Sequence, residues 1–218
     1  MSKPLLEKEF SSETPVIRDT AFWLKTWQDE QQYGFHEQQV NPLLAKFWPS
    51  LNTLSGGRVF VPLCSKSLDM LWLAEQGFQV IGVELSPIAV KAFYKENGLK
   101  PKKKRIGNFV RWCSGNISIW CGDFFALSKQ QIGKIDAVFD RAALSAMPEE
   151  SQEVYLQQLL ALLNRDTRLL LLTLEDIDAH SPEARQAIDP ALKSLCSERF
   201  SMRLLHSEMA RQFEHEND

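Results

Sequence analysis

Short apolar runs in this sequence are each followed at once by a turn or an acidic residue that could bind a ligand. The segment from Pro62 to Asp69 is a turn, and its backbone N–H groups could lie near a ligand at the start of a helix. Glu84 ends the next apolar run, about twenty residues past that turn, where an acidic residue accepts hydrogen bonds from ribose hydroxyls. Without a ligand, Glu84 would be an exposed carboxylate at a strand end. The turn lacks G-x-G-x-x-G, the pattern of dinucleotide enzymes, which argues against a pyrophosphate-bearing cofactor.

Two further polar segments end the next apolar runs. Asp123 and Phe124 follow Cys121-Gly122 and combine a carboxylate with an aromatic ring, which suits the edge and face of an adenine. Gly-Asp is also a common turn, and Phe124 could equally belong to the core. Asp140 and Arg141 place opposite charges at the mouth of the same site, or else form a structural ion pair. The order of these features on successive apolar runs carries more weight than any one of them.

The elements that position these segments alternate between short apolar and longer amphipathic runs from residue 58 onward, which predicts parallel strands joined by crossover helices. The expected strands are 58–63, 79–84, 117–121, 135–140 and 169–174. Because these runs are largely apolar, the sheet should be covered on both faces, as in doubly wound folds. In such sheets ligands bind beyond the carboxyl ends of the strands, near the point where strand order reverses.

Helices are expected between the strands and at both ends of the chain. One runs over 67–76 and is stopped by Gly77, another opens at Ser86-Pro87, and a third starts at Pro148. An aromatic-rich helix over 20–32 should pack over one end of the sheet. Towards the end of the chain we expect a helix over 182–196 and a last strand over 200–206.

Length and composition predict one domain. The 218 residues, with 44% hydrophobic and 24% charged side chains, are in the ordinary range for a single core. We expect one domain over 1–218, with 1–57 as a helical extension or lid and 58–218 as the core. The net charge of −3 gives no general attraction to nucleic acid or to an anionic membrane. The basic run 100–105 is expected to be a solvated loop.

Cysteine and histidine usage favours a metal-free protein in a reducing compartment. The four cysteines form no C-x-x-C pair, and the four histidines show no metal-ligand spacing, so no metal is expected. Nothing at the start resembles a signal peptide, and no apolar stretch approaches the roughly 20 residues that cross a bilayer. We therefore expect a cytoplasmic protein, and a monomer.

The motifs, taken in order, resemble those of the thiopurine S-methyltransferases. The matching segments are Trp23…Trp27…Gly34-Phe35-His36, Arg58 to Ser67, Gly82-Val83-Glu84-Leu85-Ser86, Ser114-Gly115-Asn116-Ile117-Ser118 and Asp140-Arg141-Ala142-Ala143-Leu144. They occur in the family's order over much of the chain, and an ordered set is more specific than any single motif.

The resemblance implies a class I methyltransferase: an α/β, Rossmann-like, doubly wound, mainly parallel sheet with an N-terminal helical lid. It implies S-adenosylmethionine as methyl donor and S-adenosylhomocysteine as product. The implied donor contacts come from Trp23, Leu63, Glu84, Asp123, Phe124 and Arg141. Phe35 would face the acceptor, and Arg141 would be the catalytic residue, stabilising a thiolate or orienting a bridging water.

The sequence departs from the family pattern at three places. Ser65 stands where relatives usually carry glycine, which matters if that position needs a positive φ. The segment 173–182 replaces a Gly-Pro-Pro-Phe segment that lies near the acceptor pocket in the family. The family's last strand, of the type aromatic-Tyr-apolar-apolar, has no counterpart, so the C-terminal edge of the sheet should be shortened.

The expected acceptor is the sulfur of a small aromatic or heterocyclic thiol, because an acidic thiol is already largely thiolate and needs alignment more than acid–base help. Selenium or tellurium species, and halide or thiocyanate ions, are alternative acceptors for the same scaffold. A cofactor-binding protein without catalysis is a further alternative. A nucleic-acid methyltransferase is disfavoured by the acidic composition and by the absence of an Asn/Asp-Pro-Pro-aromatic motif at Asp140.

Overall fold

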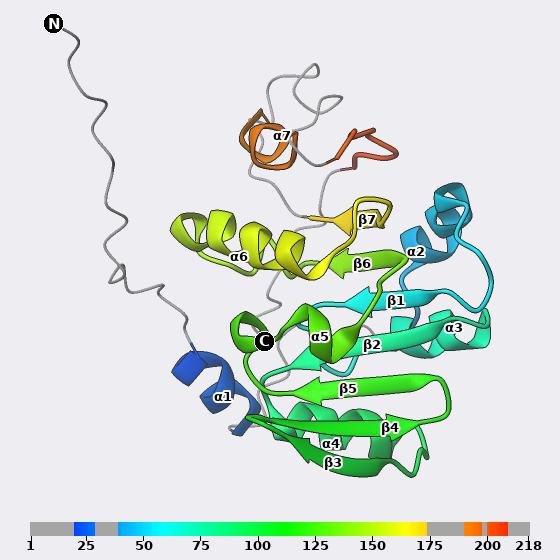
Figure 1. The fold of residues 1–218 in the computed structure, drawn as a ribbon, viewed down its shortest axis with the longest axis vertical. Coiled ribbons are helices and arrows are strands. Elements are labelled where there is room, and N and C mark those ends of the chain that lie inside the picture. Colours follow the sequence, from blue (N-terminus) through cyan, green and yellow to red (C-terminus); the bar gives the residue numbers. More distant parts are fainter. Residues whose placement is uncertain (1–19, 29–38, 174–189, 198–199, 209–218) are drawn as a thin grey trace, which may run out of the picture.

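The computed structural model describes residues 20–28, 39–173, 190–197 and 200–208 of the chain. Its strands are β1 (Arg58–Val61), β2 (Gln79–Glu84), β3 (Lys102–Ile106), β4 (Phe109–Ser114), β5 (Ile117–Cys121), β6 (Ala137–Arg141) and β7 (Arg168–Leu172). In the described part of the chain they form one seven-stranded sheet in the order β3-β4-β5-β2-β1-β6-β7 (Figure 1).

The five predicted strands form the parallel core of this sheet. The parallel pairs are β5–β2, β2–β1, β1–β6 and β6–β7. The pairs β3–β4 and β4–β5 are antiparallel. From β1 the chain adds strands on one side, ending with β5, and then crosses to β6 on the other side of β1, so strand order reverses between β1 and β6. This confirms the doubly wound α/β fold and places the expected ligand site at the carboxyl ends of β1 and its neighbours.

The basic run is a strand and not the solvated loop that its charge predicts. Lys102–Ile106 forms β3 and pairs with β4 as a hairpin that extends the sheet beyond β5. The four basic residues of β3 are exposed on both faces, so no apolar alternation marks the strand in the sequence. The Lys103 Nζ lies 3.6 Å from the centroid of the Trp112 ring on β4. Charged side chains along an edge strand also prevent pairing with another chain.

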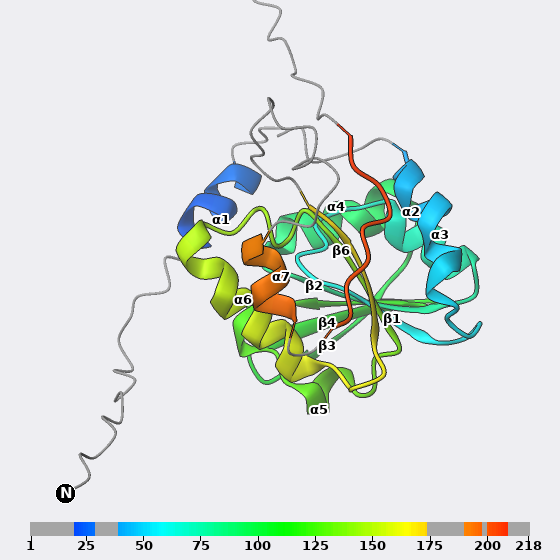
Figure 2. The same cartoon turned by 90° about the horizontal axis from the view of Figure 1, so that it is seen from above.

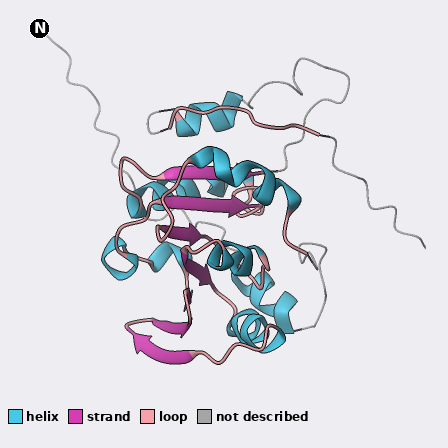
Figure 3. Cartoon of the chain, turned by 90° about the vertical axis from the view of Figure 1, so that its right-hand side faces the viewer, coloured by secondary structure: helices cyan, strands magenta, loops and turns pink. Residues whose placement is uncertain are grey.

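Helices cover both faces of the sheet. They are α1 (Thr20–Gln28), α2 (Pro42–Phe47), α3 (Asp69–Glu75), α4 (Pro87–Glu96), α5 (Lys129–Ile132), α6 (Glu149–Leu162) and α7 (Pro190–Cys196), with 3₁₀ turns at Trp48–Leu51 and Phe124–Ala126. Figure 2 shows α2, α3 and α4 on one side of the sheet and α5, α6 and α7 on the other, and Figure 3 shows helices on both sides of the strands. The predicted start of α4 is confirmed: the Ser86 Oγ accepts a hydrogen bond from the Ala89 N–H at 3.3 Å, and Pro87 is the first helical residue.

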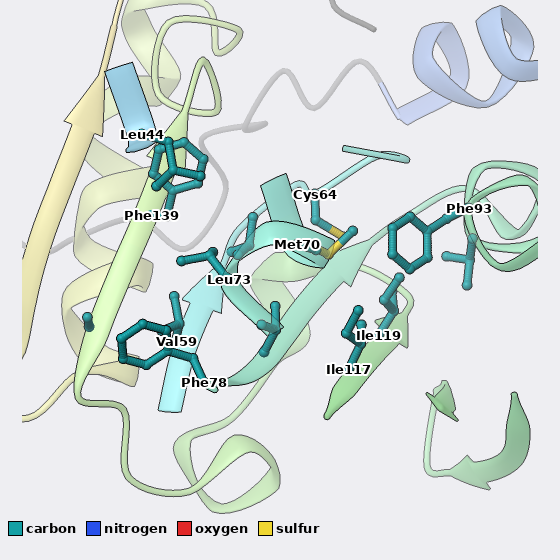
Figure 4. Close-up of a cluster of buried hydrophobic side chains, with 14 of the residues drawn as sticks. Leu44, Val59, Cys64, Met70, Leu73, Phe78, Phe93, Ile117, Ile119 and Phe139 are labelled. Atoms are coloured by element: carbon teal, nitrogen blue, oxygen red, sulfur yellow. The ribbon is translucent and has the colours of Figure 1, made fainter. Parts of the chain in front are cut away.

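Two apolar clusters lie on either side of the sheet because successive strand residues point to opposite faces. Val59 and Val61 belong to the cluster under α2, α3 and α4, whereas Phe60 between them belongs to the cluster under α5 and α6. Figure 4 shows the first cluster, with Cys64 and Met70 side by side. Gly82 lies beneath that pair, and a Cβ atom there would be 2.6 Å from the Cys64 Sγ. Glycine in the middle of β2 therefore lets the turn after β1 approach the sheet closely.

The last strand predicted over 200–206 does not form. Residues 200–208 form no strand in the described structure, so β7 is the edge of the described sheet. The segment instead crosses that edge: Phe200 and Met202 contact one cluster and Leu205 contacts the other. Its side chains are mostly polar and exposed, which explains why apolar burial holds it at only a few points. The helix predicted over 182–196 is confirmed for α7.

The first predicted helix is confirmed over α1. Figure 1 shows α1 on the side of the sheet where the parallel strands end, and it contacts α4. Residues 29–32 of the predicted helix lie outside the described residues. Across the described ranges, no helix combines the length and apolar character needed to span a membrane.

Candidate functional site

The sheet order brings four predicted site segments to one edge. The carboxyl ends of β5, β2, β1 and β6 lie next to one another in that order. Glu84 and Arg141 are the last residues of β2 and β6, and Leu63 and Asp123 lie in the turns just after β1 and β5. These residues therefore line up along the end of the sheet that the fold reserves for ligands.

The turn after β1 has an unusual backbone conformation. Leu63 has a φ of 44° and Ser65 a φ of 50°, in the left-handed region that costs a non-glycine residue roughly 1–2 kcal/mol. This confirms that the position of Ser65 needs a positive φ. The conformation is held by the sheet, because the Cys64 N–H donates to the Val83 carbonyl at 2.9 Å. Strained backbone of this kind gathers at ligand-binding turns.

Glu84 ties the turn after β1 to the start of α4. Its Oε2 accepts a hydrogen bond from the Ser65 N–H at 2.9 Å, and its Oε1 accepts one from the Ser86 N–H at 2.7 Å. The residue is only 7% exposed, so it is not the solvated strand-end carboxylate of the alternative interpretation. Burial raises the pKa of this carboxyl, and the two backbone hydrogen bonds counteract part of that increase. Each carboxylate oxygen can accept a further hydrogen bond, so Glu84 fits a ribose diol.

The turn after β5 lies against Glu84. The Gly122 N–H donates to the Glu84 carbonyl at 2.9 Å. A Cβ atom at Gly122 would be 2.5 Å from the Phe109 ring, so this turn needs glycine for its close approach. The Asp123 Oδ1 accepts a hydrogen bond from the Phe125 N–H at 2.9 Å and caps the 3₁₀ turn. The turn that carries Asp123 is thus held beside Glu84, the predicted ribose contact.

Phe124 points into the core. Its side chain is 2% exposed, and its ring is stacked 5.0 Å from the Tyr155 ring and 6.5 Å from the Phe60 ring, centroid to centroid. These contacts place it in the cluster under α5 and α6, as the alternative interpretation of its sequence position expected. Its contact with adenine stays a prediction.

Asp140 and Arg141 are adjacent in sequence but bind different partners, because neighbouring strand residues face opposite sides of a sheet. The Asp140 Oδ2 accepts a 2.6 Å hydrogen bond from the Tyr155 hydroxyl, and its Oδ1 accepts one from the Ala143 N–H at 3.1 Å. Burial raises the pKa of Asp140 to about 6, although these hydrogen bonds lower it. The Arg141 Nε lies 3.0 Å from the Asp69 Oδ2. The ion pair of this site is therefore Arg141 with Asp69.

Asp69 is a site residue that the sequence analysis missed. It is the first residue of α3 and is 1% exposed. Besides Arg141, its carboxylate accepts hydrogen bonds from the Asn41 N–H at 2.8 Å and the Ser67 hydroxyl at 2.9 Å. Ser67 is a local partner, but Asn41 and Arg141 come from distant parts of the chain, so sequence spacing does not reveal the link between Asp69 and Arg141. The one signal in the sequence was that the turn after β1 carries a carboxylate, Asp69, to which the sequence analysis gave no role.

The lid residues are described only in part. Trp23 lies on α1 with its side chain half-buried, and α1 contacts α4, the helix that begins beside Glu84. Phe35 lies outside the described residues, and the contacts expected of Trp23 and Phe35 stay predictions. Within the described ranges, no group of three or more His, Cys, Asp or Glu residues could hold a metal ion, and Cys64, Cys113, Cys121 and Cys196 are free thiols.

A doubly wound sheet that ends in this arrangement defines the class I S-adenosylmethionine-dependent methyltransferases. The same fold occurs in a Burkholderia thailandensis 1,6-didemethyltoxoflavin-N1-methyltransferase, solved with its substrate and S-adenosylhomocysteine. That protein is 17% identical with a TM-score of 0.56, and the similarity covers 83% of this chain and 75% of that chain. The family model for thiopurine S-methyltransferase (TPMT) matches residues 18–217. The chain therefore belongs to the thiopurine S-methyltransferase family, and S-adenosylmethionine is its methyl donor.

Bacterial relatives support the same assignment over most of the chain. A thiopurine S-methyltransferase of Stutzerimonas stutzeri (strain A1501) is 48% identical over 191 residues, which cover 87% of this chain and 81% of that protein. A thiopurine S-methyltransferase of Methylococcus capsulatus (strain Bath) is 52% identical over 158 residues, covering 72% of this chain and 71% of that protein.

Proposed function

We propose that this protein transfers a methyl group from S-adenosylmethionine to the sulfur of a small aromatic or heterocyclic thiol. The observation that carries the proposal is the buried Glu84 carboxylate, held by two backbone N–H groups at the switch point of a thiopurine S-methyltransferase chain. The names of the relatives support the thiol as acceptor.

Donor binding is assigned to the ends of four neighbouring strands. Glu84 accepts hydrogen bonds from the two ribose hydroxyls, through the acceptor capacity that its backbone contacts leave. Asp123 contacts the adenine beside the buried Phe124, and Leu63 and Trp23 contact the remainder of the donor. When bound, the donor supplies an electrophilic methyl group on a sulfonium.

Methyl transfer requires these residues to align the two reactants and to exclude water. An in-line displacement gains most from holding the two reacting atoms in a fixed geometry, and an acidic thiol needs no general base. Arg141 stabilises the thiolate, or orients a water against it, through a charge-assisted hydrogen bond of about 1–3 kcal/mol. Phe35 faces the acceptor.

An acceptor panel tests this function. The purified protein is incubated with methyl-labelled S-adenosylmethionine and, separately, with 6-mercaptopurine, thiophenol, iodide and selenite. We expect label on the two thiols, and about five- to 150-fold slower labelling by Glu84→Ala than by the wild type at a donor concentration below both Kd values. Transfer confined to iodide or selenite would replace the thiol by another acceptor, and no transfer to any of the four would contradict the function.

We extend the proposal to organisation and location. The chain is one domain, 1–218, in which 1–57 forms a helical extension and 58–218 the core, and it is a monomer in the cytoplasm. The free thiols support a reducing compartment. Light scattering should give a mass near 25.0 kDa, and a mass twice as large would contradict the monomer.

A further inference from the structure

The Asp69 carboxylate joins three separate segments next to the proposed reaction site. Its Oδ1 accepts a hydrogen bond from the backbone of Asn41, the residue that caps α2. Its Oδ2 accepts from the Ser67 hydroxyl in the turn after β1 and lies 3.0 Å from the Arg141 Nε at the end of β6. At 1% exposure, this carboxylate is one of the most buried charged groups described in the chain.

A helix-capping role does not explain this environment. The N-cap residue of α3 is Leu68, which makes no side-chain capping hydrogen bond, and Asp69 follows it as the first helical residue. The Asp69 carboxylate contacts Asn41, Ser67 and Arg141, none of which lies in α3. A buried carboxylate persists only when paired and hydrogen-bonded, so these contacts hold one another in place.

The geometry fixes the orientation of the Arg141 guanidinium. Its Nε faces Asp69 and its Nη2 lies 3.5 Å from the Ser67 Oγ, so the Nε–Nη2 edge is turned towards the start of α3. The guanidinium is planar, and holding one edge sets the direction of the remaining N–H groups. The Arg141 side chain is 18% exposed, so it is accessible at the end of the sheet although its Nε edge faces a buried group.

We propose that Asp69 is a positioning residue for methyl transfer, which fixes Arg141 against the thiol and links it to the chain segment that enters α2 at Asn41. This inference rests on the proposed function, in which Arg141 stabilises the thiolate or orients a water against it. Asp69 acts through Arg141 and contacts neither reactant.

The decisive variant is Asp69→Asn. An amide has a single oxygen, so it cannot accept from both the Asn41 N–H and the Arg141 Nε, although it fills the same space. We expect kcat with thiophenol to fall roughly tenfold or more, while the Kd for S-adenosylhomocysteine changes by less than about threefold. A fall in Tm with unchanged kcat at a temperature where the variant is folded would overturn the proposal.

A matched control is Asp136→Asn. The Asp136 carboxylate also accepts from a backbone N–H, that of Arg58 at 2.9 Å, and pairs with Lys134 at 3.1 Å. It precedes β6 and therefore lies at the opposite end of that strand from Arg141. This variant should lower the free energy of unfolding and leave kcat unchanged. An equal loss of kcat in both variants would contradict a specific role for Asp69.

A double-mutant cycle separates action through Arg141 from independent action. In an Arg141→Gln background, Asp69→Asn should change kcat by less than about twofold, because the group that it positions is gone. A full additional loss in that background would overturn the proposal.

Arginine side-chain NMR provides a readout that needs no turnover. The Nε–H of Arg141, identified by its loss in Arg141→Lys, should exchange slowly in the wild type and rapidly in Asp69→Asn. If the wild type transfers no methyl group, the proposed function fails, and this signal still reports on the link between Asp69 and Arg141. Equal exchange in the wild type and Asp69→Asn would contradict that link.

Discussion

At the scale of single residues, backbone strain and buried charge gather where the site is proposed. Leu63, Ser65 and Ala142 have positive φ values and follow β1 and β6, the two strands on either side of the reversal in strand order. Asp69, Glu84 and Asp140 are carboxylates buried at the same end of the sheet. Such groups reduce stability unless their surroundings fix them, so they mark positions kept for a purpose other than folding.

Substitution at Ser65 measures the backbone strain. Ser65→Gly and Ser65→Ala both remove the hydroxyl and differ only in their tolerance of a φ of 50°. We expect the glycine variant to be more stable by about 1 kcal/mol in urea unfolding. The same pair at Ser194, in helix α7, should show the reverse order by a similar amount. A more stable alanine variant at Ser65 would contradict the positive φ.

The buried Asp140 carboxyl gives stability a definite pH dependence. Because its pKa is about 6 in the folded protein and the ordinary value for an aspartate is 3.8, the folded state binds more protons between these two pH values. Its contribution to stability is therefore greatest below about pH 4 and is lost as the pH rises through about 6, by up to about 3 kcal/mol. The difference in unfolding free energy between wild type and Asp140→Asn should follow this curve, and a difference independent of pH would contradict it.

At the scale of elements, the sequence predicted what apolar burial determines. The five parallel strands and the start of α4 follow from continuous apolar runs and from the Ser86-Pro87 signal, and all are present. The β3–β4 hairpin could not be recognised because β3 has basic side chains on both faces. The last strand was predicted from apolar residues such as Phe200 that contact the core across the β7 edge without forming a ladder. Asp69 was missed because its contacts with Asn41 and Arg141 are tertiary and leave no pattern in the sequence.

The hairpin owes part of its stability to one cation–aromatic contact. The Lys103 Nζ lies over the Trp112 ring, whereas Lys104 is exposed opposite Arg111, a residue of like charge. We expect Lys103→Ala to lower the free energy of unfolding by about 0.5–1 kcal/mol. Lys104→Ala is the matched control and should leave stability unchanged or slightly higher. Equal losses in the two variants would show that the contact adds nothing specific.

At the scale of the whole molecule, one end of a doubly wound sheet carries every residue assigned to donor binding in the described core. The order β5-β2-β1-β6 makes neighbours of segments that are far apart in sequence, and hydrogen bonds from Ser65 and Gly122 to Glu84 join three of them. The fold class and family were predictable because the motifs keep their order along the chain. The acceptor side was not, because it depends on segments that depart from the family pattern.

The most direct test of the donor site is calorimetric binding of S-adenosylhomocysteine and of its 2′,3′-dideoxy analogue to wild type and Glu84→Ala. Loss of the carboxylate should weaken binding of S-adenosylhomocysteine by about 1–3 kcal/mol. The dideoxy analogue lacks the hydroxyls, so its binding should be weakened much less. Glu153→Ala, on the exposed face of α6, should bind both ligands as the wild type does. The same loss of affinity for both ligands, or none for either, would show that Glu84 does not hold the ribose.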